Sequence, residues 1–336
     1  MNINLVNGSN FAYFSDVIYS QVIETDKFKS QKIDDVYILD ENDRYVFYKL
    51  NKFTVKTNDV IYCNSLLLEC LFRDLKKLKN VRNLKLITSQ SDRLINKKTI
   101  RNIPDSISEY YAINISTSHI KLKSLPLGIA NDYSPKNLLS KDLSIPLSVE
   151  NSREKKLYLN FNELTNIKHR KNLKEYFIKF NWAVVRKESI SLEEYKNDIK
   201  NYQFILCPWG NGIDTHRIWE ALYLGSTPVV KWHKTFECIK NLPVIFFDHY
   251  EEIDILFLEN KFKNLKNLDF KKDFLEIDYW INQIKQNKVD ENHKEVIQSS
   301  EIYLKLFVLN RQIKLVINRN IKKIKFRLYQ ISKKLN

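Results

Sequence analysis

The sequence predicts an α/β protein made of two Rossmann-like halves that face each other across a crevice. Three observations support this prediction. Short apolar runs alternate with helical segments along the chain, most regularly in its second half. A polar stretch with two prolines and no periodicity, at about residues 131–155, divides the two alternating patterns. Three of the five glycines lie within sixteen residues, directly after an apolar run, where open α/β sheets bind ligands.

The first half contains five short apolar runs that we expect to form strands, separated by helical segments. They are residues 3–6, 36–39, 60–63, 84–88 and 122–125. Because this alternation continues up to the polar stretch, it predicts a first Rossmann-like domain over residues 1–140.

The second half alternates strand and helix more strictly. We expect strands at residues 157–161, 182–186, 204–208, 227–231 and 244–248. We expect helices at residues 171–180, 192–201, 215–224 and 251–262, with a short helix near Phe236. Runs such as Phe-Ile-Leu-Cys at 204–207 are apolar on both faces, which is typical of buried parallel strands. These elements predict a second Rossmann-like domain over residues 155–285.

A loop with two glycines, at residues 208–212, joins a predicted strand to a predicted helix. We expect Gly210 and Gly212 to adopt positive φ and to allow another group to approach the backbone closely. Asp214 or Thr215 is expected to cap the helix. The free N–H groups and the dipole at the start of that helix predict an anion site.

Two charged residues follow on the first turns of the same helix. The Arg217 guanidinium matches the geometry of phosphate oxygens, and Glu220 can accept hydrogen bonds from a ribose diol. With the loop, they fit a diphosphate-linked nucleoside. The alternative is a tight connection in which Arg217 and Glu220 form an i, i+3 ion pair while Trp219 and Leu222 pack in the core. The spacing matches neither the dehydrogenase fingerprint nor a P-loop.

Composition limits the class of protein. With 43% hydrophobic and 28% charged residues, the chain has enough apolar surface to form cores, which excludes a disordered chain. No run approaches the ~20 apolar residues that cross a bilayer, and the N-terminus does not resemble a signal peptide. We therefore expect a cytoplasmic protein with four free cysteines. The scattered histidines and cysteines predict no metal site.

Residues 310–336 carry nine of the fifteen excess positive charges and no acidic residue. Apolar residues recur there every three or four positions, so we predict a C-terminal helical segment over residues 290–336 with an apolar and a cationic face. Such a helix suits an anionic membrane surface, which we expect residues 310–336 to contact. Packing on the protein's own surface, coiled-coil pairing and nucleic-acid binding are the alternatives.

The stretch from residue 204 to residue 248 resembles the nucleotide-sugar half of exostosin-like glycosyltransferases of the GT-B fold. The run Asp-Thr-His-Arg-Ile-Trp-Glu-Ala-Leu at 214–222 carries most of the likeness, and Leu-Pro-Val-Ile-Phe-Phe-Asp follows at 242–248. Similar bacterial and giant-virus enzymes also share features like residues 89–92, 125–128 and 159–170. The resemblance spans roughly residues 84–262.

The resemblance implies transfer of a hexose or galactofuranose-type sugar from a nucleotide-diphosphate donor, a UDP-sugar, with inversion and without a bound metal or other cofactor. The acceptor implied is a glycan or lipid-linked molecule in lipopolysaccharide, capsule or other surface polysaccharide synthesis, at the inner face of the membrane. The D-x-D sequence of metal-dependent sugar transferases is absent. Arg217, Arg170 and the helix N-terminus would neutralise the diphosphate leaving group electrostatically.

The residues expected to bind the nucleotide sugar lie mostly in the glycine loop and the helix after it. They are Gly8, Arg170, Trp209, Gly210, Asn211, Gly212, Asp214, Thr215, His216, Arg217 and Glu220. Trp209 stands where an arginine is expected after the proline, and we interpret it as an aromatic platform for the base or the sugar.

Inversion requires a general base for the acceptor hydroxyl, which we expect from the first half, across the crevice. Asp92, at the carboxyl end of the predicted strand 84–88, is preferred, and Asp16 is the second candidate. Asp214 and His216 flank the loop and are expected to orient substrate instead.

Two functions of other classes stay open. A nucleic-acid-binding protein would use the basic tail with the aromatic residues Tyr110, Tyr111 and Trp209, and would have no use for the glycine loop. An inactive scaffold would bind a sugar nucleotide without turning it over. The enzyme interpretation expects no nucleic acid as partner.

Overall fold

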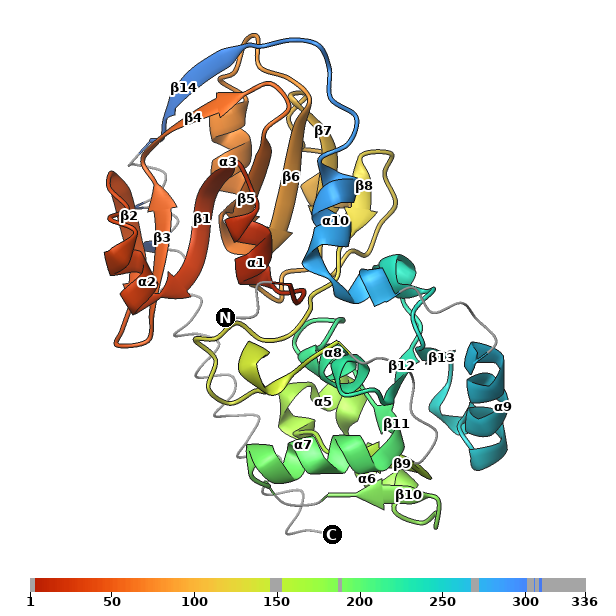
Figure 1. The fold of residues 1–336 in the computed structure, drawn as a ribbon. Helices are drawn as coiled ribbons and strands as arrows, with labels where there is room; N and C mark the ends of the chain where they lie inside the picture. The colour runs from red at the N-terminus through yellow and green to blue at the C-terminus, as the bar shows by residue number, and fades with distance from the viewer. Residues whose placement is uncertain are drawn as a thin grey trace.

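The computed structural model describes residues 4–145, 153–186, 189–266 and 272–300, together with residues 305, 308 and 309. The fold is mixed α/β with parallel sheets, as predicted (Figure 1). One sheet is formed before residue 125, and a second is formed between residues 154 and 247. The predicted basic helix at residues 310–336 lies outside the described residues.

The first half is built on a seven-stranded sheet in the order β2-β3-β1-β5-β6-β7-β8. Strands β1, β5, β6, β7 and β8 run parallel, whereas β3 pairs antiparallel with both β1 and β2. The strands are β1 (Val17–Glu24), β2 (Val36–Glu41), β3 (Tyr45–Leu50), β5 (Val60–Asn64), β6 (Leu84–Ser89), β7 (Ile107–Ala112) and β8 (Leu122–Ser124). The helices are α1 (Gly8–Tyr13), α2 (Thr25–Ser30), α3 (Leu68–Leu75) and α4 (Lys97–Ile100).

Local sequence predicted only part of this sheet. Four of the five expected strands are confirmed, but the described part of residues 3–6 forms a single β-bridge, between Leu5 and Glu276. Strands β1, β3 and β7 were not predicted, because polar side chains interrupt their apolar patterns. In β1 the buried Gln21 donates to Tyr48 Oη at 2.9 Å, and in β3 the buried Lys49 donates to Leu50 O at 2.8 Å. These polar groups find partners only in the folded protein.

The second sheet has five parallel strands in the order β10-β9-β11-β12-β13. They are β9 (Glu154–Leu159), β10 (Ala183–Val185), β11 (Tyr202–Leu206), β12 (Thr227–Lys231) and β13 (Ile245–Phe247), at all five predicted positions. In chain order this is 2-1-3-4-5, a doubly wound arrangement in which the direction of winding changes between β9 and β11. Ligands of such sheets bind at the carboxyl ends of the strands at that point.

The helices of the second half are α5 (Ile167–Arg170), α6 (Leu173–Phe177), α7 (Leu192–Asn201), α8 (His216–Tyr223), α9 (Ile255–Lys266) and α10 (Ile277–Ile284). Short 3-10 helices are η1 (Ser65–Leu67), η2 (Ser140–Asp142), η3 (Glu163–Thr165), η4 (Lys234–Ile239), η5 (Tyr250–Glu252) and η6 (Lys272–Leu275).

Local signals explain where two of these helices begin and end. Ser191 and Glu194 form a capping box at the start of α7, with Glu194 N donating to Ser191 Oγ and Ser191 N donating to Glu194 Oε2. Helix α8 ends in a Schellman motif, because Gly225 adopts φ 79° and Ser226 N donates to Ala221 O at 2.8 Å. Sequence therefore sets the start of α7 and the end of α8.

The segment after residue 271 returns to the first half, which corrects the predicted boundaries at residues 285 and 290. Strand β14 (Lys294–Gln298) pairs antiparallel with β4 (Lys52–Lys56), and its Ile297 is buried in the core of the first half (Figure 1). Ile277 N, at the start of α10, donates to Asn4 O at 2.8 Å. The backbone N–H and C=O groups of an edge strand need a partner, and β14 supplies one to β4.

The polar stretch between the halves is also more than a linker. Its described part, up to residue 145, buries Leu138 and Leu143 in the core, and its Asn131 and Tyr133 line the pocket described below. Two well-spaced leucines are too few to give a periodic signal, so the sequence suggested only a linker here. Residues 146–152 lie outside the described part of the chain.

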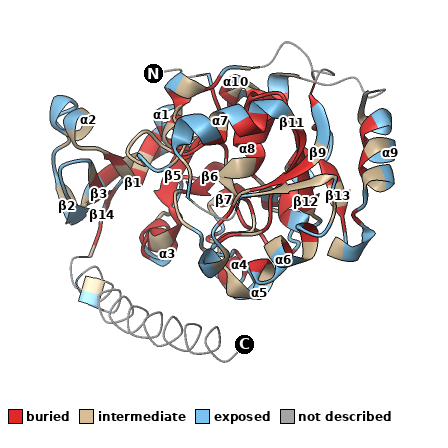
Figure 2. Cartoon of the chain, turned by 90° about the horizontal axis from the view of Figure 1, so that it is seen from below, coloured by how far each residue is buried: buried red, intermediate tan, exposed pale blue. Residues whose placement is uncertain are grey.

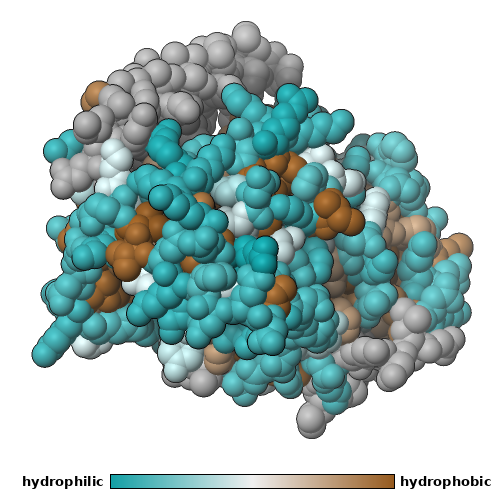
Figure 3. Space-filling model, turned by 90° about the horizontal axis from the view of Figure 1, so that it is seen from above, coloured by the Kyte–Doolittle hydropathy of each residue, from teal (hydrophilic) through white to brown (hydrophobic). Residues whose placement is uncertain are grey.

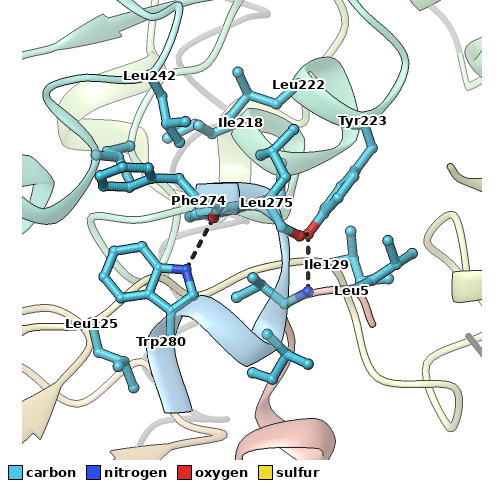
Figure 4. Packing of buried hydrophobic residues seen from close by; sticks show 14 of the residues in the cluster. Leu5, Leu125, Ile129, Ile218, Leu222, Tyr223, Leu242, Phe274, Leu275 and Trp280 are labelled. Atoms are coloured by element: carbon cyan, nitrogen blue, oxygen red, sulfur yellow. Dashed lines mark hydrogen bonds between the residues drawn. The ribbon is translucent and has the colours of Figure 1, made fainter. Parts of the chain in front are cut away.

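A hydrophobic cluster formed by both halves joins them (Figure 4). Tyr223 of α8 receives a hydrogen bond from Val6 N at 2.9 Å and donates to Leu275 O at 2.7 Å. Around it pack residues of both halves: Leu5, Leu125, Ile129, Ile218, Leu222, Leu242, Phe274 and Trp280. Figure 2 shows the same pattern, with buried residues in the strands of both sheets and in α8. Helix α8 is therefore fixed against the first half as well as against its own sheet.

The described surface is mostly hydrophilic, and hydrophobic residues form small separate patches on the face shown in Figure 3. In the described residues no helix is long and apolar enough to span a membrane. All four cysteines are free thiols, as predicted.

Candidate active site

A pocket of about 460 Å³ lies between the two halves. The residues after β6, the residues after β11 and the first turn of α8 line it. It therefore lies at the edge of the second sheet where doubly wound sheets bind ligands. Most residues that the sequence singled out line this pocket: Gly8, Asp92, Arg170, Gly210, Asn211, Gly212, Asp214, Thr215, His216, Arg217 and Glu220.

Asp16 does not belong to this pocket, which corrects the second candidate for the base. It is exposed and precedes β1, and its Oδ2 accepts a hydrogen bond from Val60 N at 2.8 Å. Val60 is the first residue of β5, so Asp16 lies at the amino ends of strands whose carboxyl ends point toward the pocket. The carboxylate ties the start of two neighbouring strands together.

Trp209 lies beside the pocket but not among the residues that line it. Its Nε1 donates to Lys231 O at 3.3 Å, and its indole packs between the rings of His169 and His233, at 4.8 and 5.2 Å between centroids. The indole is thus held by the protein, which does not support the interpretation of a free aromatic platform.

The glycine loop is held by a residue that the sequence analysis missed. Asn114, which follows β7 in the first half, accepts hydrogen bonds on its Oδ1 from Ile213 N at 2.8 Å and from Asp214 N at 3.0 Å. A Cβ on Gly212 would lie 2.7 Å from Asn114 Nδ2, so only glycine allows this approach. No sequence signal identified Asn114, because the strand before it was not predicted and its φ of 54° is known only from the structure.

The predicted anion site at this loop therefore needs a correction. The amides of Ile213 and Asp214 are already bound by Asn114 and are not available to a ligand. Gly210 and Gly212 also lack the positive φ that we expected. Glycine is needed at position 212 because the Asn114 side chain approaches the backbone closely there. What remains for a ligand is the N-terminus of α8, one turn further along the chain.

Asp214 ties the two halves together rather than capping α8. It is buried, and its Oδ2 accepts a hydrogen bond from Leu127 N of the first half at 3.0 Å. Its Oδ1 accepts one from Trp219 Nε1 at 3.2 Å. Burial raises the pKa of Asp214 to about 7, although the hydrogen bonds from Leu127, Trp219 and the Thr215 amide oppose this rise.

This pKa predicts that Asp214 makes stability fall as pH rises toward neutrality. The folded protein keeps the proton up to about pH 7, whereas the unfolded chain releases it near the ordinary value of 3.8, so deprotonation costs more in the folded state. Between pH 5 and pH 8 we expect wild type to lose roughly 2–3 kcal/mol relative to Asp214→Asn, as measured by urea unfolding of both proteins. A difference that does not change with pH would contradict the raised pKa.

Arg170 holds together the loops that follow β9 and β11, where the direction of winding of the second sheet changes. Its guanidinium donates to the carbonyls of Asn162, Pro208 and Trp209, at 3.1, 3.0 and 2.8 Å. It therefore joins the segment after β9 to the segment after β11, and it is not a free phosphate ligand. Burial lowers its pKa to about 10, with a further lowering by the positive charge of Arg217. Both arginines line the pocket.

Arg217 brings a second cation into the pocket, where burial opposes its charge while Glu220 and a hydrogen bond with Tyr195 favour it. Its Nε is buried and has no hydrogen-bond partner, and its guanidinium lies over the Tyr195 ring, 5.8 Å from the centroid. The pKa of the nearby Lys174 is lowered first by burial and also by Arg217. Cations gathered in this way are stable when an anion joins them.

Thr215 adds a second unpartnered polar atom to the same end of the pocket. It is the N-cap residue of α8, yet its side chain makes no capping hydrogen bond, and its Oγ1 is buried without a partner. The first amides of a helix also lack intrahelical acceptors and carry the positive end of the dipole. Thr215, Arg217 and this helix end therefore form a place for an anion with several oxygens.

Glu220 supplies a carboxylate at this end of the pocket. It is buried and lines the pocket, and its Oε2 accepts a hydrogen bond from Tyr195 Oη at 2.7 Å. Tyr195 lies under Arg217 as well, so one tyrosine orients both the cation and the acceptor. This arrangement keeps Glu220 in place for a neutral, hydroxyl-bearing part of a ligand.

The opposite wall of the pocket is polar and almost uncharged. It contains Gly8, Ser89 and Asn131 of the first half, where Asn131 Oδ1 accepts hydrogen bonds from Ser9 N and Ser9 Oγ at 2.8 and 2.9 Å. A Cβ on Gly8 would lie 3.1 Å from Ser89 Oγ, which is buried and without a partner in hydrogen-bond geometry. A Cβ on Gly8 would also lie 2.9 Å from Gln90 Cγ, so the close approach of these side chains requires glycine here.

Asp92 and His216 lie where these two walls meet. His216 Nδ1 is 2.8 Å from Gly128 O. Asp92 is exposed to the pocket, and burial by the pocket walls raises its pKa, while the charge of His216 and a hydrogen bond from Asn211 lower it. The described residues bring no three histidine, cysteine, aspartate or glutamate side chains together as a metal site.

The comparisons with known proteins agree with this geometry. Residues 150–302, a little under half of the chain, match the family model described as the RXYLT1 C-terminal domain. The match supports a glycosyltransferase of the exostosin family, and the parallel sheets fit a Rossmann-like glycosyltransferase fold. No curated protein matches the chain.

Proposed function

We propose that this protein is a GT-B glycosyltransferase that transfers a sugar from a nucleoside-diphosphate donor, a UDP-sugar, to a hydroxyl group of a glycan acceptor. The observation that carries the proposal is the pair of buried, unpartnered polar atoms, Thr215 Oγ1 and Arg217 Nε, at the N-terminus of α8 in the pocket. Buried polar atoms are rarely left without partners, and in a pocket water or a ligand can supply them.

The diphosphate fits the cationic end of the pocket. Arg217, the N-terminus of α8 and the nearby charges of Arg170 and Lys174 would stabilise the negative charge that develops on the leaving group. Glu220, held by Tyr195, lies beside them for hydroxyl groups of the donor. The protein's own charges thus favour departure of the nucleoside diphosphate.

The acceptor fits the opposite wall. Gly8, Ser89 and Asn131 line it with polar groups and no cation, which suits the hydroxyl groups of a sugar. Donor and acceptor would then meet beside Asp92 and His216, between the two halves. A transfer with inversion would require the acceptor to attack from the side opposite the leaving group.

Ligand-induced stabilisation tests the proposal. At a concentration of about 100 times Kd, UDP should stabilise the folded protein by about 2.7 kcal/mol and raise the melting temperature by several degrees. NAD and a single-stranded oligonucleotide at equal concentration should not. Stabilisation by the oligonucleotide alone would favour the nucleic-acid-binding alternative. Binding of UDP without hydrolysis of UDP-glucose, UDP-galactose, UDP-N-acetylglucosamine or UDP-xylose would favour the inactive scaffold.

A further inference from the structure

We infer that His216 is the general base that takes the proton from the acceptor hydroxyl, and that Asp92 faces it to stabilise the imidazolium that forms. This inference rests on the proposed function and names the group that performs its proton transfer. It differs from the expectation that a first-half carboxylate is itself the base.

The hydrogen bond of His216 fixes its tautomer. Gly128 O is a carbonyl oxygen and can only accept, so Nδ1, at 2.8 Å, carries the proton and donates it. In the neutral ring, Nε2 is then the nitrogen with a free lone pair. The backbone carbonyl thus performs the orienting role that a carboxylate performs in other histidine bases.

The position of His216 suits proton transfer from an acceptor. As the first residue of α8, it precedes Arg217, which we assign to the diphosphate, and it lines the pocket. Its ring is hydrogen-bonded to Gly128 O. The turn at Gly128 leads to Ile129 and Asn131, in the wall of the pocket that we assign to the acceptor. The free nitrogen therefore lies between the two bound substrates, where the new bond forms.

Asp92 is better suited to stabilise charge than to accept the proton. Burial raises the pKa of Asp92, but the charge of His216 and a hydrogen bond from the Asn211 amide act in the opposite direction and favour the ionised form. An imidazole also binds a proton more tightly than a carboxylate does near neutral pH, which makes it the stronger base there. An ionised Asp92 beside His216 then attracts the imidazolium without taking its proton.

The step balances within these groups. The acceptor oxygen forms a bond to the anomeric carbon of the donor sugar, and its proton passes to His216 Nε2. The bond from the anomeric carbon to the diphosphate oxygen breaks, and its electron pair stays on that oxygen next to Arg217. The imidazolium faces Asp92 until the proton is released to solvent with the products.

Replacing His216 with asparagine tests the inference, because the asparagine amide can still donate to Gly128 O but has no basic nitrogen. We expect His216→Asn to keep its Kd for UDP within about threefold, and to lower kcat for hydrolysis of the UDP-sugar that wild type uses by about 10²–10⁴-fold. His233→Asn is the matched control, since His233 caps η4 outside the pocket, and its kcat should not change.

Asp92→Asn separates the two roles. If Asp92 stabilises the imidazolium, this variant loses less activity than His216→Asn. The acidic limb of the pH profile, which is the fall of kcat as pH decreases, should persist but move to lower pH. Loss of that limb in Asp92→Asn, or a His216→Asn enzyme with more than a tenth of wild-type kcat, would overturn the inference.

Two further outcomes are kept distinct. If His216→Asn does not fold, His216→Gln serves instead, since its amide reaches the Nε2 position without a basic nitrogen, and the same loss of kcat is expected. Wild-type protein that binds no UDP would refute the proposed function itself. Normal UDP binding with an active His216 variant would refute only the base assignment.

Discussion

Arg217→Ala should weaken UDP binding by at least about 100-fold and lower kcat by about 10²–10³-fold, while the protein folds as before. The guanidinium reaches the pocket with a buried Nε that has no partner, and no carboxylate forms an ion pair with it among the described residues. Its removal takes away the proposed ligand contact, together with the contact to the Tyr195 ring and the attraction to Glu220. Isothermal titration with UDP and a hydrolysis assay measure the two effects.

Two further variants separate the contact from the charge. Arg217→Lys keeps the charge but loses the planar fork, so its affinity for UDP should lie between those of wild type and Arg217→Ala. Arg44→Ala changes net charge equally at an exposed residue whose one ion pair is with the neighbouring Asp43, at 4.0 Å, and should bind UDP normally. Equal affinity of Arg217→Ala and wild type would place the diphosphate elsewhere.

Gly128→Ala should cost several kcal/mol of stability and lower the amount of folded protein. Gly128 adopts φ 74°, and a Cβ there would lie 1.9 Å from the backbone oxygen of Val6. That oxygen cannot move aside, because it accepts a hydrogen bond from Ile129 N at 2.9 Å and belongs to the segment that contacts Tyr223. Urea unfolding measures the loss of stability. The substitution should also disturb the Gly128 carbonyl that orients His216.

Gly225→Ala is the matched control for backbone conformation. Gly225 has a similar φ of 79° at the end of α8, where the ordinary cost of the left-handed region is about 1 kcal/mol. The expected difference between the two variants is therefore the steric conflict at Gly128. Equal losses would mean that the turn at 125–128 can shift away from Val6.

The sequence alone determined the second half and most of the pocket. Its strands are short and apolar on both faces, Ser191 and Glu194 cap α7, and Gly225 ends α8, so each element follows from neighbouring residues. The cluster from Gly210 to Glu220 was recognisable because a strand, a loop and a helix N-terminus lie together in the chain.

Tertiary structure decided which first-half residues complete the pocket. Asn114 holds the glycine loop and Gly128 orients His216, yet each lies about 90–100 residues from its partner, and no local pattern links them. Asp16 remained the second candidate after Asp92 because the strand that follows it, β1, was not predicted, so its end of the sheet was unknown. Local sequence specifies secondary structure through short-range hydrogen bonds and periodicity, whereas the site depends on contacts that form only when the two halves pack together.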